Sequence, residues 1–161
     1  MLGLGFGKPL AVGSQAPDFT LPDQDGRPTV LSEALKAGPA VVYFYPRDDT
    51  PGCTAEACKF RDDYQDFTDA GAQVFGVSDD DVATHKRFAE RHRLPFRLLA
   101  DTDNAVHKAY GLQAALGLLR GRVTYVIDRQ GIVRHSFDAR INAVAHVRDA
   151  LKVLRALKET P

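Results

Sequence analysis

Apolar positions follow two patterns along the chain. Continuous runs of β-branched and aromatic residues predict strands buried on both faces, and apolar residues at spacings of three and four predict amphipathic helices. The two patterns alternate in the order β-α-β-α-β-α-β-β-α. We expect strands near 40–45, 73–78, 96–99, 123–127 and 133–137, and helices near 51–71, 81–92, 104–110 and 144–157.

This order predicts an α/β, thioredoxin-like fold, in which a central mixed β-sheet is flanked by helices on both faces. The turn sequence 128–131 joins the last two strands as a hairpin, and the segment 17–31, with Asp25-Gly26, predicts a small N-terminal hairpin. A chain of 161 residues suits one core. We expect a flexible N-terminal segment over 1–11 and a single domain over 12–161.

Charge and hydropathy exclude several classes of function. The 21 basic and 21 acidic residues give a net charge of zero, without a dense basic run, which argues against a nucleic-acid or membrane-surface partner. No apolar stretch approaches the ~20 residues of a membrane span, and the start lacks a signal-peptide pattern. We therefore expect a cytoplasmic protein. The Gly-rich run 3–8 lacks the Ser/Thr of a phosphate loop and has Pro9 there instead.

Only two cysteines are present, Cys53 and Cys58, whereas a small secreted disulfide scaffold carries more. The five histidines are scattered without the ligand spacing of a zinc site, so we expect no metal and no cofactor. Asp48, Asp49 and the run 79–81 are interpreted as loop caps and solvated side chains rather than as acid/base groups.

The position of Cys53 favours reactivity. It follows a buried strand, at the edge of the sheet where open α/β proteins bind ligands. Thr50 is a candidate N-cap and Pro51 suits the first helical position, so Cys53 lies in the first turn. Free amides and the positive end of the helix dipole favour a thiolate there. Gly52 leaves room for a small substrate to approach the backbone.

Helix geometry separates the two cysteines. Cys53 shares an apolar stripe with positions 57, 60, 64 and 67, whereas Cys58 is rotated by roughly 140° toward polar positions and the surface. Their α-carbons would be about 8.6 Å apart in an intact helix, and a disulfide rarely tolerates more than ~7 Å. The two thiols therefore cannot bond unless the first turns unwind.

The run Pro-Arg-Asp-Asp-Thr-Pro-Gly-Cys-Thr-Ala-Glu-Ala-Cys, which begins at residue 46, resembles the active-site signature of the peroxiredoxins. It is most similar to the subgroup called bacterioferritin comigratory protein, or peroxiredoxin Q. The resemblance extends over about 12–157 and includes an arginine that enters a late strand, in Gly-Arg-Val-Thr-Tyr-Val-Ile-Asp. The residues that match the family pattern are Pro46, Thr50, Cys53, Glu56, Cys58 and Arg122.

The resemblance implies a thiol peroxidase that reduces hydrogen peroxide and organic hydroperoxides. The Cys53 thiolate would attack the peroxide and become a sulfenic acid. Cys58 would then resolve it as an intramolecular disulfide, and thioredoxin or a similar dithiol protein would reopen the bond. With both cysteines in one subunit, we expect a monomer.

Four further residues receive roles in this scheme. Arg122 would hold the thiolate and donate hydrogen bonds to the peroxide oxygens. The Thr50 hydroxyl and the Cys53 amide would orient the peroxide. Pro46 would shield the sulfur from water, and Glu56 would fix the arginine.

Other interpretations remain open. A redox switch or chaperone-like binding protein could use the same disulfide to change shape with little turnover. A thioredoxin-type disulfide exchanger is disfavoured, because its motif has two residues between the cysteines and this chain has four. Cys53 could also be an ordinary buried small side chain. The apolar loop Leu116–Leu119 could line a site for organic peroxides or simply pack.

Overall fold

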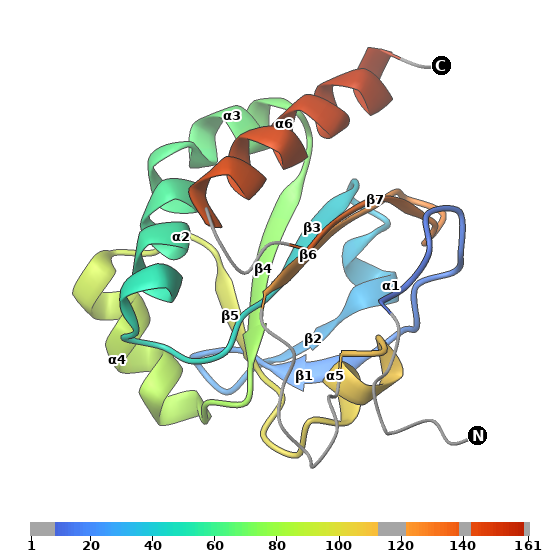
Figure 1. Cartoon of the computed structure of the whole chain (residues 1–161). Helices are drawn as coiled ribbons and strands as arrows, with labels where there is room; N and C mark the ends of the chain where they lie inside the picture. The colour runs from blue at the N-terminus through green and yellow to red at the C-terminus, as the bar shows by residue number, and fades with distance from the viewer. Residues whose placement is uncertain (1–8, 113–121, 139–142, 160–161) are drawn as a thin grey trace.

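A five-stranded mixed sheet forms the centre of the protein (Figure 1). The computed structural model describes residues 9–112, 122–138 and 143–159. The strand order is β5-β4-β3-β6-β7; β3 pairs in parallel with β4, and β4 with β5, whereas β6 is antiparallel to both β3 and β7. The strands are β3 (Ala40–Phe44), β4 (Gln73–Ser78), β5 (Arg97–Ala100), β6 (Val123–Ile127) and β7 (Val133–Asp138).

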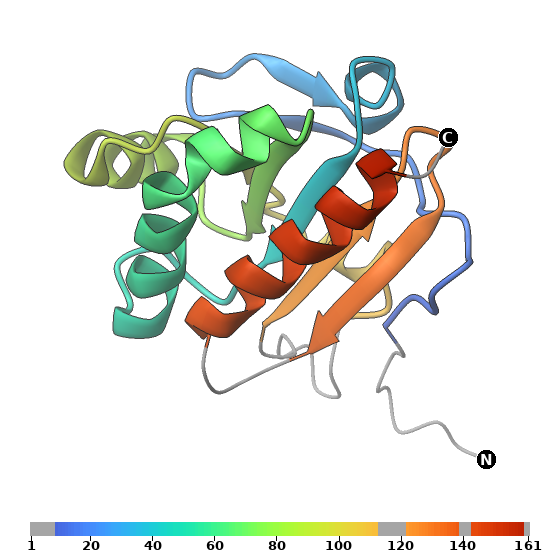
Figure 2. The same cartoon turned by 90° about the horizontal axis from the view of Figure 1, so that it is seen from above.

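Helices cover both faces of this sheet (Figures 1 and 2). One face is covered by α2 (Pro51–Asp62), α3 (Tyr64–Asp69), α4 (Val82–His92) and α6 (Ala143–Glu159). The other face carries α1 (Leu31–Ala34), α5 (Ala105–Ala109) and a separate antiparallel hairpin of β1 (Thr20–Pro22) and β2 (Pro28–Val30). Among the described helices, none has the length and apolar character that crossing a membrane requires.

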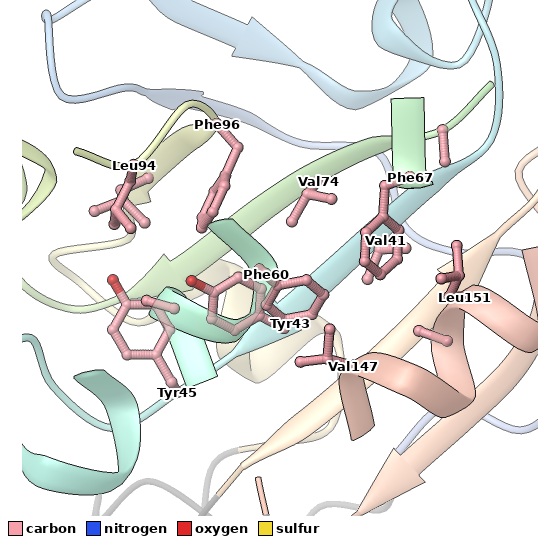
Figure 3. Close-up of a cluster of buried hydrophobic side chains, with 14 of the residues drawn as sticks. Val41, Tyr43, Tyr45, Phe60, Phe67, Val74, Leu94, Phe96, Val147 and Leu151 are labelled. Atoms are coloured by element: carbon pink, nitrogen blue, oxygen red, sulfur yellow. The ribbon is translucent and has the colours of Figure 1, made fainter. Parts of the chain in front are cut away.

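The central strand β3 supplies both halves of the core. Val41 and Tyr43 pack with α2, α3 and α6 on one face, and Figure 3 shows Tyr43 beside Phe60 of α2. Val42 and Phe44 pack on the opposite face. Side chains alternate between the faces of a strand, and all five residues of β3 are buried, which explains its uninterrupted apolar run.

The predicted order of strands and helices and the thioredoxin-like architecture are confirmed. The structure differs in the single helix expected over 51–71. It is divided at Asp63 (φ −98°, ψ 8°), which ends α2 and precedes α3. Asp63 also forms an ion pair with Lys59, four residues earlier, at 2.9 Å. The short helix α1 was not predicted. Residues 1–8 and the Leu116–Leu119 loop lie outside the described residues.

Candidate active site

The loop between β3 and α2 brings Pro46 and Thr50 to the edge of the sheet. Thr50 occupies the N-cap position, with extended backbone angles (φ −85°, ψ 151°), and its carbonyl accepts from Thr54 N at 2.8 Å. Pro51 begins the helix, as predicted. The Thr50 hydroxyl donates to the Arg47 carbonyl at 3.0 Å and makes no capping bond. Pro46 is half-buried in the same loop.

Three predicted residues meet beside the first turn of α2. Arg122 directly precedes β6, and its Nη1 donates to Cys53 Sγ at 3.4 Å and to Glu56 Oε1 at 2.9 Å. All three side chains are buried, Cys53 to 1% and Glu56 to 0% exposure. Because β6 pairs with β3, the sheet brings an arginine 69 residues away in sequence to the cysteine. One guanidinium therefore faces both a sulfur and a carboxylate.

Burial and charge act in opposite directions on this cluster. Burial raises the pKa of the Glu56 carboxyl from its ordinary 4.5 to about 7, and the Arg122 guanidinium opposes that shift. Burial lowers the pKa of Arg122, but the charges of Glu56 and Cys53 outweigh it, and the net shift is upward. Among the described atoms, Glu56 Oε2 has no hydrogen-bond partner. Arg122 thus remains a cation that can stabilise negative charge on sulfur.

Gly52 lies in a close approach to Arg122 that the sequence did not reveal. A Cβ at this position would lie 2.8 Å from Arg122 Nη2 and 3.7 Å from its Cζ. That Gly52 leaves room for a substrate stays a prediction; in the structure the guanidinium lies beside its Cα, where the Cβ of a larger residue would be. The residue therefore permits Arg122 to reach Cys53.

Cys58 lies on a different side of the same helix, where it contacts α4. Its thiol is half-buried and free, and its Sγ lies 3.8 Å from His92 Nδ1. Arg61 Nη1 donates to the His92 carbonyl at 2.8 Å and ties the two helices together. Both free thiols are therefore in one intact helix, as predicted.

Asp48 was interpreted as a loop cap or a solvated side chain, and the expected solvation is wrong. It is buried to 4% exposure, and its carboxylate lies 2.6 Å from His85 Nδ1 and accepts from Tyr45 at 2.5 Å. Asp80 joins the group, and the three residues offer ligand atoms within 4.8 Å of one another. The sequence contained no local signal for this group, because its members come from two loops and a helix.

Comparisons with known proteins agree on one family. The model of the AhpC/TSA family matches residues 12–136. A peroxiredoxin Q, chloroplastic, of Oryza sativa subsp. japonica is 51% identical over 146 residues, which are 90% of this chain and 67% of the relative. The peroxiredoxin Q, chloroplastic, of Arabidopsis thaliana is 48% identical over 155 residues, 96% of this chain and 71% of the relative.

Solved structures show the same relationship. Peroxidoxin BcpB from Mycobacterium tuberculosis superimposes with a TM-score of 0.86 at 40% identity, over 91% of this chain and 97% of the other. Peroxiredoxin Q from Xanthomonas campestris gives 0.80 at 31% identity, over 88% and 92%. With its buried thiol beside an arginine, the chain belongs to the AhpC/TSA family and is a thiol peroxidase of the peroxiredoxin Q group.

Proposed function

We propose that Cys53 is the peroxidatic nucleophile. Its thiolate attacks one oxygen of a hydroperoxide, the O–O bond breaks, and the leaving oxygen takes a proton to give water or an alcohol. The sulfur becomes a sulfenic acid. Hydrogen peroxide and organic hydroperoxides are the proposed substrates.

The contact between Arg122 Nη1 and Cys53 Sγ carries this proposal. A guanidinium at 3.4 Å stabilises the thiolate and can stabilise the charge that moves from sulfur to oxygen during attack. Glu56 Oε1 accepts a second hydrogen bond from the same nitrogen at 2.9 Å and holds the guanidinium in place. We assign Thr50 and the free amides of the helix start to peroxide binding, Pro46 to shielding of the sulfur, and Gly52 to admitting the arginine.

We propose that Cys58 completes the cycle. Its thiol attacks the Cys53 sulfenic sulfur, an S–S bond forms, the S–OH bond breaks, and the hydroxyl leaves as water. The half-exposed side of α2 supports this role, because a second protein must later reach the disulfide. A dithiol protein, thioredoxin or a similar one, then reduces it by exchange.

We further propose that residues 12–161 act as one domain and that the enzyme works as a monomer. The proposed disulfide needs no second subunit, since both thiols are in α2. Over 9–112, 122–138 and 143–159, the large hydrophobic side chains that are exposed are Val12 and Val144, too few for a broad apolar interface. Sedimentation of the reduced enzyme would check this. A cytoplasmic location also stays a prediction, because the plant relatives are named chloroplastic.

Two serine variants test the thiol roles. Cys53→Ser should abolish peroxide consumption in the presence of thioredoxin, thioredoxin reductase and NADPH. Cys58→Ser should react once with peroxide and leave a sulfenic acid that dimedone traps. Rapid first turnover by Cys53→Ser would reverse the assignment. A wild-type protein that forms the disulfide but consumes no peroxide catalytically would instead indicate a redox switch.

A further inference from the structure

A group of buried polar side chains anchors the loop between Pro46 and Thr50. Asp48 Oδ1 accepts a hydrogen bond from the Tyr45 hydroxyl at 2.5 Å, and its Oδ2 lies 2.6 Å from His85 Nδ1. The other ring nitrogen, His85 Nε2, lies 3.0 Å from the Leu99 carbonyl. The Asp48 and His85 side chains are both 0% exposed. The proposed peroxidase chemistry does not use either of them.

Hydrogen-bond chemistry fixes the number of protons on this pair. The Leu99 carbonyl can only accept, so His85 Nε2 must carry a proton. The contact of 2.6 Å between Nδ1 and Oδ2 requires a second proton between them, whichever atom holds it. The pair as a whole is therefore neutral, which reduces the cost of burying it. Burial raises the pKa of Tyr45 well above its ordinary value, so its hydroxyl remains a donor to Asp48.

The backbone amide of Asp48 is hydrogen-bonded as well as its side chain. Asp48 N donates to Asp80 Oδ2 at 2.8 Å, and the same oxygen accepts from the Ser78 hydroxyl at 2.6 Å. Asp80 follows β4 and precedes α4, and His85 lies in α4. The loop is thus attached to β4, α4 and β5, and none of these attachments passes through the cysteine helix.

We propose that Asp48 and His85 are positioning residues of the peroxidase, which hold the loop so that Thr50 and the start of α2 meet the peroxide in the reactive geometry. The proposal rests on the proposed function. Thr50 lies two residues after Asp48, and Pro46 two residues before it, so a shift of Asp48 moves both. The same group could be considered as a metal site. Its contacts with one another, with Tyr45 and with Ser78 already account for the arrangement, and we assign the positioning role.

Comparing the rate of peroxide reduction with the rate of alkylation of Cys53 distinguishes a positioning role of Asp48 and His85 from a purely structural one. Peroxide reduction needs an oriented O–O bond, whereas iodoacetamide needs only a reactive thiolate. Asp48→Ala removes the partner of both Tyr45 and His85, so the rate constant with hydrogen peroxide should fall by about tenfold or more. Alkylation of Cys53 in the Cys58→Ser background should change by less than about twofold, because Arg122 remains in place. The chain has no tryptophan, so competition with a haem peroxidase for peroxide is the practical rate assay.

Conservative variants test whether hydrogen bonding is the cause. Asp48→Asn can still accept from Tyr45 and can donate to a neutral His85, so it should retain the peroxide rate within about threefold. His85→Asn keeps an amide near the Nδ1 position, which faces Asp48, whereas His85→Gln places its amide near Nε2, which faces Leu99. At comparable thermal stability, His85→Asn should retain a higher rate of peroxide reduction than His85→Gln.

The chain contains a matched control. Asp101 and His107 form a second buried pair, with Nδ1 and Oδ2 also 2.6 Å apart, but it caps α5 instead of the cysteine loop. Asp101→Ala should lower the melting temperature and leave the peroxide rate unchanged.

Equal peroxide rates in wild type and Asp48→Ala would overturn the positioning role. The positioning role would also be overturned if Asp48→Ala lowered the rates of peroxide reduction and of Cys53 alkylation by the same factor. If Asp48→Ala does not fold, equal rates in the two His85 variants decide against it. Absence of catalytic peroxide consumption by the wild type would overturn the proposed function itself.

Discussion

At the scale of single residues, the site depends on one guanidinium that serves two partners. Arg122 donates from the same nitrogen to Cys53 and to Glu56. The guanidinium lies close beside Gly52, where the Cβ of any other residue would be in contact with it. The family pattern was sufficient to select Cys53, Glu56 and Arg122 from the sequence. It did not predict the close approach of Arg122 to Gly52, because that contact joins segments far apart in the sequence.

Gly52→Ala should slow peroxide reduction while the protein remains stable. The added methyl group would lie 2.8 Å from Arg122 Nη2, so the guanidinium must shift from the position in which it contacts the sulfur. A misplacement of a catalytic group by about 1 Å costs roughly ten- to a hundredfold in rate. Competition kinetics would measure the loss, and thermal unfolding would show the retained stability.

Gly26→Ala provides the control for this variant. Gly26 has φ +77°, and a Cβ added there would meet no atom within 4 Å, so alanine strains the backbone without touching the site. It should cost about 1 kcal/mol of stability and no peroxide rate. A Gly52→Ala enzyme as fast as wild type would show that Arg122 does not need its observed position.

The raised pKa of Glu56 predicts a specific dependence of stability on pH. The carboxyl titrates near 4.5 when unfolded and at about 7 when folded, so the folded state binds more protons between these values. The free energy of unfolding therefore falls as pH rises from about 4.5 to about 7, by at most about 3 kcal/mol from this group. Glu56→Gln should remove that slope in urea titrations across this range.

The exposed Glu33 serves as the comparison for Glu56. Glu33→Gln should leave the decrease between pH 4.5 and 7 as it is in the wild type, because the Glu33 side chain is 65% exposed. If Glu56→Gln kept the full slope, the carboxyl would not titrate as its burial indicates.

At the scale of secondary-structure elements, α2 carries both thiols of the proposed cycle on different sides. Cys53 is buried against the sheet, and Cys58 contacts α4. The periodicity of apolar residues predicted this separation of faces. It did not predict the interruption at Asp63, since apolar positions continue at helical spacing through Phe67.

Oxidation should unwind the first turns of α2. The Cα separation in the helix, about 8.6 Å, exceeds the ~7 Å that a disulfide tolerates. Unwinding loses a few hydrogen bonds of about 1 kcal/mol each, a cost that disulfide formation can offset. Hydrogen exchange of reduced and oxidised protein should show protection lost around 55–59 on oxidation. Cys58→Ser treated with peroxide supplies the control, because it cannot form the bond. Equal protection in both states, with the Cys53–Cys58 bond confirmed, would refute unwinding.

At the scale of the whole molecule, one strand links two halves of the core. Alternate residues of β3 enter opposite clusters, and all are buried. The sequence predicted this sheet well, because continuous apolar runs leave few other arrangements for its strands. It could not predict the Asp48–His85 pair, whose members are 37 residues apart and meet only after the sheet and α4 have assembled.

Val42→Ala should lower stability without affecting catalysis. Val42 is fully buried on the face opposite α2, so its loss leaves a cavity distant from Cys53. We expect a loss of about 2 kcal/mol, or roughly 4–8 °C in melting temperature, with a single transition. Calorimetry and peroxide kinetics at 25 °C would check both statements. Two separate transitions would argue against one cooperative domain.

The interruption at Asp63 bears on the unwinding that we expect on oxidation, because it divides α2 from α3. α3 begins as a separate helix whose Phe67 is fully buried, and Gly71 then turns the chain into β4 with φ +78°. If oxidation unwinds the first turns of α2, we expect α3 to stay docked through Phe67 and the sheet to keep its register. In each catalytic cycle, only the first turns of α2 would then unfold, and they would repack on a sheet and an α3 that have not moved.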